Sequence, residues 1–135
     1  MREIKFRIWD GNEIRQIPNY RLDCFGMIWW QFGYDEEKSC DPIRNKIMQY
    51  TGLKDKNNKE IYEGDIIRYD NLKTKDDKIN VGVVTYREFG TRFIANTNNA
   101  YYGDEQFYQD YTEIIGNIYE NPGLLIPLTD QNKND

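Results

Sequence analysis

Regular alternation of apolar and polar residues near the start of the chain restricts its fold more than any other feature. In residues 3–9 every second position is apolar, namely Ile4, Phe6 and Ile8, and this period of two is typical of a half-buried strand. The next three residues, Asp-Gly-Asn, tolerate the positive φ of a tight turn. The pattern therefore predicts an amino-terminal hairpin that returns through residues 13–17.

Further short segments favour strands over helices. Aromatic residues make up 15% of the chain and eleven of them are tyrosine, a composition suited to pleated, half-buried surfaces. Turn-forming residues separate these segments: a turn is expected at Asn57 and Asn58, and a bend at Glu63-Gly64-Asp65. The expected strands cover residues 27–32, 46–50, 66–69, 81–87, 91–95 and 113–118.

Two segments favour short helices, and two others favour loops. Residues 103–111 fit an amphipathic helix capped by Asp104, with a strand as the alternative, and Asn121-Pro122 is typical of a helix start. Residues 34–45 and 70–80 have the polar composition of surface connections.

Together these patterns predict a mainly β protein. We expect an SH3-like barrel or strongly bent antiparallel sheet, joined by an N-terminal hairpin and one or two short helices. One domain should cover residues 1–128, with a hairpin region of about residues 1–45 and a barrel-like core of about residues 46–128. Residues 129–135 are polar and are expected to form a flexible tail.

Charge and hydropathy favour a cytoplasmic protein whose surface has no general affinity for polyanions. The formal net charge is −5, which disfavours general nucleic-acid binding. Arg2, Lys5 and Arg7 nevertheless form a local basic face on the first strand. No stretch approaches the roughly 18 apolar residues of a membrane span, and the first ten residues lack the apolar core of a signal peptide.

The residue types needed for common enzyme and metal sites are scarce. The chain has no histidine and two cysteines, Cys24 and Cys40, so a usual zinc site is excluded and no cofactor is expected. Both thiols are expected to be reduced, with a mutual or intermolecular bridge as the alternative. Glu63 and Asp65 could serve as an acid and a base, but a structural bend explains them better. We expect no enzyme.

Adjacent aromatic residues supply the candidate binding residues. Trp29 and Trp30 must face opposite sides of their strand, so only one can easily join a single-faced core. A second layer, the loop over residues 34–45, a neighbouring subunit or a ligand would cover the other. Tyr101 and Tyr102 begin an acidic, aromatic stretch that suits a protein interface, or else a helix face packed on the sheet.

Three blocks of sequence resemble the YopX family of phage and prophage proteins. They are REIKFR with WD in residues 2–10, MQYTGLKD and EIYEGDI in residues 48–66, and IGNIYENP with LL in residues 115–125. Asn58 stands where the family commonly has Gly, a change that left-handed geometry tolerates. Gly123 replaces a common Glu. The resemblance implies a β-barrel-containing protein of uncharacterised function and no active site.

These observations favour a non-enzymatic phage accessory protein that acts through protein association, as a homo-oligomer or with a host or phage protein. The alternatives are a nucleic-acid-binding module, in which the basic face grips phosphates and aromatics stack on bases, and an acidic inhibitor of a host enzyme.

Overall fold

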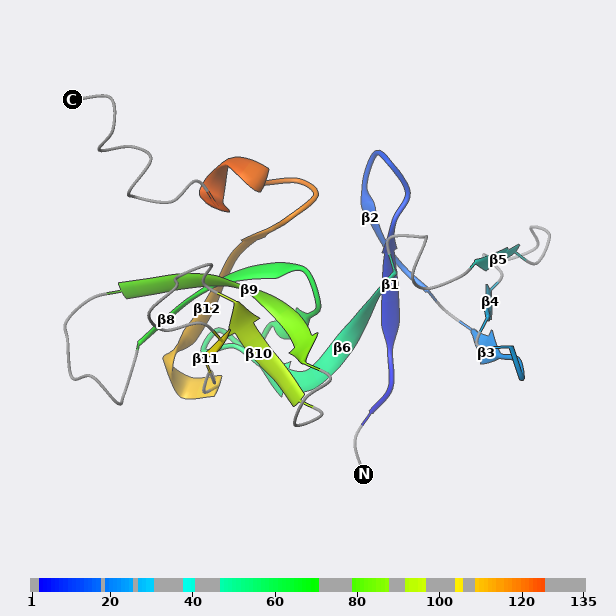
Figure 1. Ribbon diagram of the computed structural model, residues 1–135, viewed down its shortest axis with the longest axis horizontal. Coiled ribbons are helices and arrows are strands. Elements are labelled where there is room, and N and C mark those ends of the chain that lie inside the picture. Colours follow the sequence, from blue (N-terminus) through cyan, green and yellow to red (C-terminus); the bar gives the residue numbers. More distant parts are fainter. Residues whose placement is uncertain are drawn as a thin grey trace. The chain divides into compact units, whose positions relative to one another are not determined.

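Twelve short strands and two 3-10 helices make up the regular structure of the residues described by the computed structural model (Figure 1). These residues are 3–17, 19–25, 27–30, 38–40, 47–70, 79–87, 92–96, 104–105 and 109–125. They fall in two compact units, Met1–Tyr50 and Thr51–Asp135. The division follows Tyr50, a few residues beyond the predicted change from hairpin region to core. The predicted tail over residues 129–135 lies outside the described residues.

The first unit contains one hairpin and one small sheet. The hairpin strands β1 and β2 pair antiparallel, with Ile8 opposite Arg15, and β6 pairs with the other side of β1. The small sheet has the order β3-β4-β5. The strands are β1 (Phe6–Trp9), β2 (Ile14–Gln16), β3 (Arg21–Leu22), β4 (Ile28–Trp30), β5 (Lys38–Cys40) and β6 (Ile47–Lys54), which continues into the second unit.

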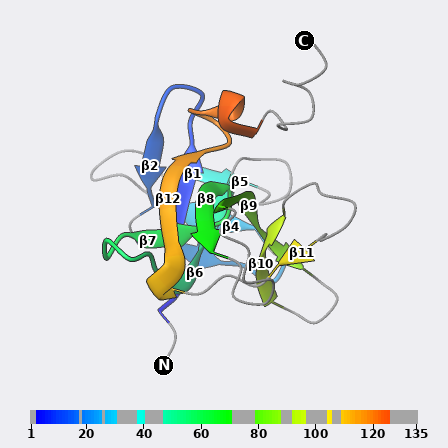
Figure 2. The same cartoon turned by 90° about the vertical axis from the view of Figure 1, so that its left-hand side faces the viewer.

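The second unit is built on a five-stranded antiparallel sheet of order β11-β10-β9-β8-β12. The sheet curls into a half-barrel, which agrees with the predicted mainly β, strongly bent architecture. Figure 2 shows β12 beside β8, with which it pairs. The elements are β7 (Glu60–Tyr62), β8 (Asp65–Asp70), β9 (Ile79–Arg87), β10 (Arg92–Asn96), β11 (Asp104–Glu105), η1 (Gln109–Tyr111), β12 (Thr112–Asn117) and η2 (Pro122–Leu125).

Each unit has a hydrophobic core of its own. In the first unit the core is buried beneath the apolar face of β1, as the alternation predicted, although Ile4 lies before the strand and is 51% exposed. The buried residues are Phe6, Ile17, Ile28 and Trp30 in the first unit and Ile61, Ile67, Tyr69, Val84 and Ala95 in the second.

Three turns use the left-handed backbone that the sequence indicated. Gly11 and Gly64 have φ of 97° and 83°, values at which a Cβ would be strained. Asn58 has φ of 67°, so the Asn that replaces the family's Gly adopts the geometry expected of it. Residues 71–78, from the predicted loop, lie outside the described residues.

Two local predictions were wrong. In the described part of residues 103–111 the expected amphipathic helix is replaced by its strand alternative: Asp104 and Glu105 pair as β11 with Asn96 and Ala95. Residues 109–111 form the 3-10 helix η1, and residues 103 and 106–108 lie outside the described residues. A ladder of hydrogen bonds to β10 here outweighs a weak local helix signal. The predicted connection over residues 34–45 contains a strand, β5, whose residue Ser39 is opposite Trp29.

Candidate functional site

Asp23 fixes the shape of the hairpin formed by β3 and β4, called here the β3–β4 hairpin (residues 21–30). Its Oδ1 accepts the backbone N–H groups of Phe25 at 2.8 Å and Met27 at 3.0 Å, and its Oδ2 accepts Nε1–H of Trp29 at 2.8 Å. The indole hydrogen bond from Trp29 is the main cause that lowers the pKa of the Asp23 carboxyl below its usual value. One ionised side chain therefore holds three points of the turn.

The tryptophan pair divides between the two faces of β4, as strand geometry requires. Trp30 is buried in the core of the first unit beside Ile28 and Phe6. Trp29 is half-buried on the other face, where the guanidinium of Arg21 lies 4.7 Å from its ring centroid. The neighbouring strand thus covers Trp29 through a cation–π contact, a cover not among those the sequence suggested.

The end of the β3–β4 hairpin exposes apolar side chains. Phe25 is 86% exposed and Leu22 is 58% exposed, whereas large apolar residues usually gain free energy by burial. Cys24, between Asp23 and Phe25, is a free and exposed thiol. Backbone strain does not explain why Phe25 and Leu22 are exposed, because the N–H groups of the turn are hydrogen-bonded to Asp23. Leu22 and Phe25 are together called the hairpin tip.

The predicted basic face of β1 is drawn into internal contacts. Lys5 pairs with Glu3 at 3.2 Å and its Nζ lies 5.5 Å from the ring centroid of Tyr50. Arg7 donates from Nη2 to the sulfur of Met48 at 3.6 Å, and Met48 is 2% exposed. Both cations are therefore half-buried on a face that also buries apolar groups. The remaining candidates, Arg2, Tyr101 and Tyr102, lie outside the described residues.

The Glu63-Gly64-Asp65 bend is a structural turn in this fold. Asp65 is 2% exposed and its Oδ2 accepts the N–H of Tyr62 at 2.8 Å. Gly64 supplies the positive φ, and its N–H donates to the carbonyl of Val84 at 2.9 Å. In the described part of the chain, no three His, Cys, Asp or Glu side chains gather as metal ligands would.

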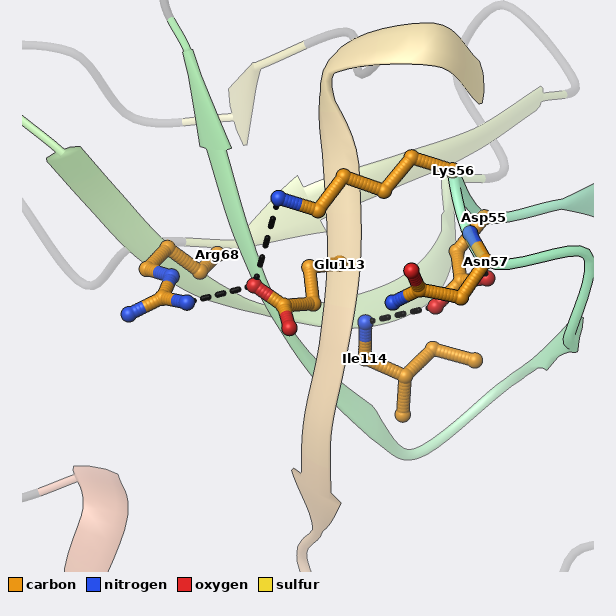
Figure 3. A network of polar contacts seen from close by, with 6 residues as sticks. All are labelled: Asp55, Lys56, Asn57, Arg68, Glu113 and Ile114. Carbon is orange, nitrogen blue, oxygen red and sulfur yellow. Dashed lines mark hydrogen bonds and ion pairs between the residues drawn. The ribbon is translucent and has the colours of Figure 1, made fainter.

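A second polar network joins the β6–β7 turn to β12 (Figure 3). Asp55 is 2% exposed; its Oδ1 accepts the N–H groups of Asn57 and Lys59, each at 2.9 Å, and its Oδ2 accepts that of Ile114. Beside it, Glu113 on β12 reaches Arg68 on one side and Lys56, 3.5 Å away, on the other. The Arg68 hydrogen bond is the main cause that lowers the pKa of Glu113.

In the last sequence block, residues 115–125, the backbone of Gly116 lies against the side chain of Asn121. A Cβ built on Gly116 would lie 2.6 Å from Oδ1 and 2.9 Å from Cβ of Asn121. Asn121 is held there because its Oδ1 accepts the N–H of Asn117 at 3.3 Å, while Asn117 in turn accepts the N–H groups of Tyr119 and Glu120. The glycine is required because a side chain would displace Asn121.

Sequence reasoning missed the hairpin tip and the role of Asp23. The signal was present, since Asp23 is followed three residues later by Gly26, a pairing common in turns. Nothing in the pattern showed that Phe25 would point into solvent. In the three sequence blocks that carry the family resemblance, by contrast, Asp55, Asp65 and Gly116 make contacts within the fold. The residues that make this resemblance recognisable are therefore not the exposed ones.

Comparison with known proteins gives a family and a fold. The sequence model of the family described as YopX protein matches residues 5–126. The structure of protein EF1440 from Enterococcus faecalis is similar, with TM-score 0.58 and 28% identity over 93% of this chain and 99% of that one. Protein yopX from Bacillus subtilis is also similar, with TM-score 0.61, 19% identity and the same shares covered. None of the curated proteins matches.

Within the described residues, no helix has the length and apolar character to cross a membrane.

Proposed function

This chain belongs to the YopX family, and we propose that it is a non-enzymatic phage accessory protein that acts by protein association through the hairpin tip. The family has no characterised function, so no known activity passes to this chain. The proposal rests on one observation: Phe25 is 86% exposed on a turn that Asp23 holds in place. Partners in the bacterial cytoplasm would gain free energy by covering this ring.

The energetics suit a binding anchor. Full burial of a Phe side chain contributes about 1.5–3 kcal/mol, and an anchor already fixed by its turn loses little conformational entropy on binding. Aromatic residues are also enriched at protein interfaces. The polar groups of the turn are hydrogen-bonded to Asp23, yet the ring of Phe25 lies in solvent. In this position the ring contributes nothing to the hydrophobic core of the chain.

Capture from an extract of the bacterium that carries the gene tests the proposal. Tagged wild-type chain, Phe25→Ala and the control Leu124→Ala would be compared; Leu124 is 46% exposed on η2, away from the hairpin in sequence. We expect wild type and the control to retain the same protein, or to self-associate. Phe25→Ala should retain at least about tenfold less of that protein. Equal retention by all three folded variants, or no association at all, would overturn the proposal.

A further inference from the structure

The outer side of β3 is a strand edge with a definite pattern of backbone groups. In the sheet order β3-β4-β5, β3 pairs with β4 and has no neighbour on its other side among the described strands. The N–H of Asp23 donates toward β4, to the carbonyl of Met27 at 3.1 Å. Because backbone groups alternate along a strand, the N–H and C=O of Leu22 point away from β4.

The apolar face of this small sheet continues to that edge. Leu22 is opposite Ile28 in the register and therefore shares its face with Ile28 and Trp30, which are 1% and 6% exposed. Leu22 itself is 58% exposed. Strand edges that end in water are usually protected by charge, proline or a bulge. The charges of Arg21 and Asp23 lie on the Trp29 face of the sheet, whereas on the core side the edge carries a leucine.

Residues 21–23 are complementary to themselves when they run antiparallel. They read Arg, Leu, Asp, so a second copy in reverse places Leu22 opposite Leu22 and each Arg21 opposite the Asp23 of the other copy. Arg21 and Asp23 both lie on the face of Trp29, since Arg21 stacks on its ring and Asp23 accepts its indole N–H. Cross-strand partners share a face, so the opposite charges would meet.

We propose that a second copy of this chain binds at β3, so that two β3 strands pair antiparallel around a two-fold axis beside Leu22. This inference rests on the proposed function and names one partner for it. The two Leu22 residues exchange both of their backbone hydrogen bonds, the two small sheets become one sheet of six strands, and Arg21 and Asp23 form two ion pairs between copies. A two-fold contact of this kind uses the same patch on both subunits.

A cysteine placed at residue 22 tests the register directly. Residues of a hydrogen-bonded antiparallel pair have Cα atoms about 5.5 Å apart, which lies within the range of a disulfide, about 4.4–6.8 Å. With Cys24 and Cys40 replaced by serine, Leu22→Cys should give mostly disulfide-linked dimer under mild oxidation, and Leu124→Cys should not. In the wild type, Cys24 would lie opposite Tyr20 of the other copy, so we expect no Cys24 cross-link.

Charge reversal tests the ion pairs. Arg21→Glu puts two like-charged pairs across the contact and should weaken dimerisation about tenfold, as measured by sedimentation equilibrium. Arg21→Gln loses the stack on Trp29 without adding like charge, and should fall between Arg21→Glu and wild type. Arg92→Glu, an equal change of charge at an exposed residue of β10, should leave the dimer unchanged.

The outcomes separate this inference from the proposed function. A purified wild-type chain that sediments as a monomer, or a Leu22→Cys variant that cross-links no better than Leu124→Cys, overturns the β3 pairing. If Phe25→Ala still loses a captured protein in that case, association through the hairpin tip stands without the dimer. A dimer that responds equally to Arg21→Glu and Arg92→Glu also contradicts the pairing.

Discussion

Asp55 accepts the backbone N–H of Ile114 across 59 residues of sequence, with 3.1 Å between Oδ2 and the nitrogen. Lys56, the next residue, donates its own N–H to the carbonyl of Thr112 at 2.9 Å. The β6–β7 turn therefore occupies the outer side of β12, where a sixth strand of the sheet would otherwise lie. A residue of the family's central sequence block thus acts as a clamp between distant segments.

Removing this clamp should destabilise the second unit. In Asp55→Ala, the half-buried N–H of Ile114 loses its partner, as do two N–H groups of the turn. We expect a loss of roughly 2–4 kcal/mol in the free energy of unfolding, measured by urea unfolding followed by far-UV circular dichroism. Asp10→Ala is the control, because Asp10 accepts two N–H groups in an exposed turn where water replaces it. Equal losses for the two variants would contradict the clamp.

Alanine at residue 116 should reveal a steric requirement. The new Cβ would overlap the side chain of Asn121, so Gly116→Ala should cost about 1–3 kcal/mol. The same substitution in an Asn121→Gly background should cost much less, because the overlapping atoms are gone, and a double-mutant cycle measures the difference.

Gly123→Ala is the matched control for that cycle. A Cβ at Gly123 meets nothing within 4 Å, so this change should be neutral or stabilising by up to about 1 kcal/mol. If Gly116→Ala proves as mild as Gly123→Ala in thermal unfolding, the close approach of Asn121 is not a requirement of the fold.

The sequence predicted those parts of the fold whose signal is local. Period-two alternation located β1, and the left-handed turn at Asn58 followed from residue type. It failed where partners distant in sequence decide the outcome: β11 forms because Asn96 and Ala95 lie opposite it, and no local pattern encodes that pairing. The hairpin tip was missed for a different reason: the groups that Asp23 binds lie within six residues of it, but residue type alone did not show that Phe25 would be exposed.

The β3–β4 hairpin should resist acid until well below neutral pH. The pKa of Asp23 is lowered in the folded chain from its usual 3.8, chiefly by the Trp29 hydrogen bond. A lowered folded pKa means that the stabilisation is complete above the unfolded value and is lost as the pH falls through the folded value. The indole N–H resonance of Trp29 should therefore stay constant from neutral pH to about pH 5 and move only below 3.8.

Assignment of that resonance uses Trp29→Phe, which removes one of the three indole signals. The pKa of Asp10 is also lowered, mainly by the N–H of Glu13, so this carboxyl serves as an internal reference. Movement of the Trp29 signal between pH 7 and pH 5 would show that Asp23 does not hold the indole in its charged form.

Trp30 should tolerate phenylalanine far better than alanine. Its Nε1 is buried and has no hydrogen-bond partner in the described part of the chain, so Trp30→Phe removes an unsatisfied donor along with part of the ring. The two effects offset each other, each being of order 1–3 kcal/mol, and we expect a net change within about 1 kcal/mol. Trp30→Ala should cost about 3–5 kcal/mol. Urea unfolding followed by circular dichroism distinguishes these outcomes.

Closure of the β12 edge bears on how this protein behaves at high concentration. Lys56 and Asp55 occupy one part of that edge, and farther along the strand Asn117 gives its N–H to the side chain of Asn121. An open strand of six residues would offer a template on which further chains could grow into amyloid-like fibres. Because the N–H groups of Ile114 and Asn117 and the carbonyl of Thr112 are already engaged, an incoming strand would have to displace these contacts before it could pair with β12.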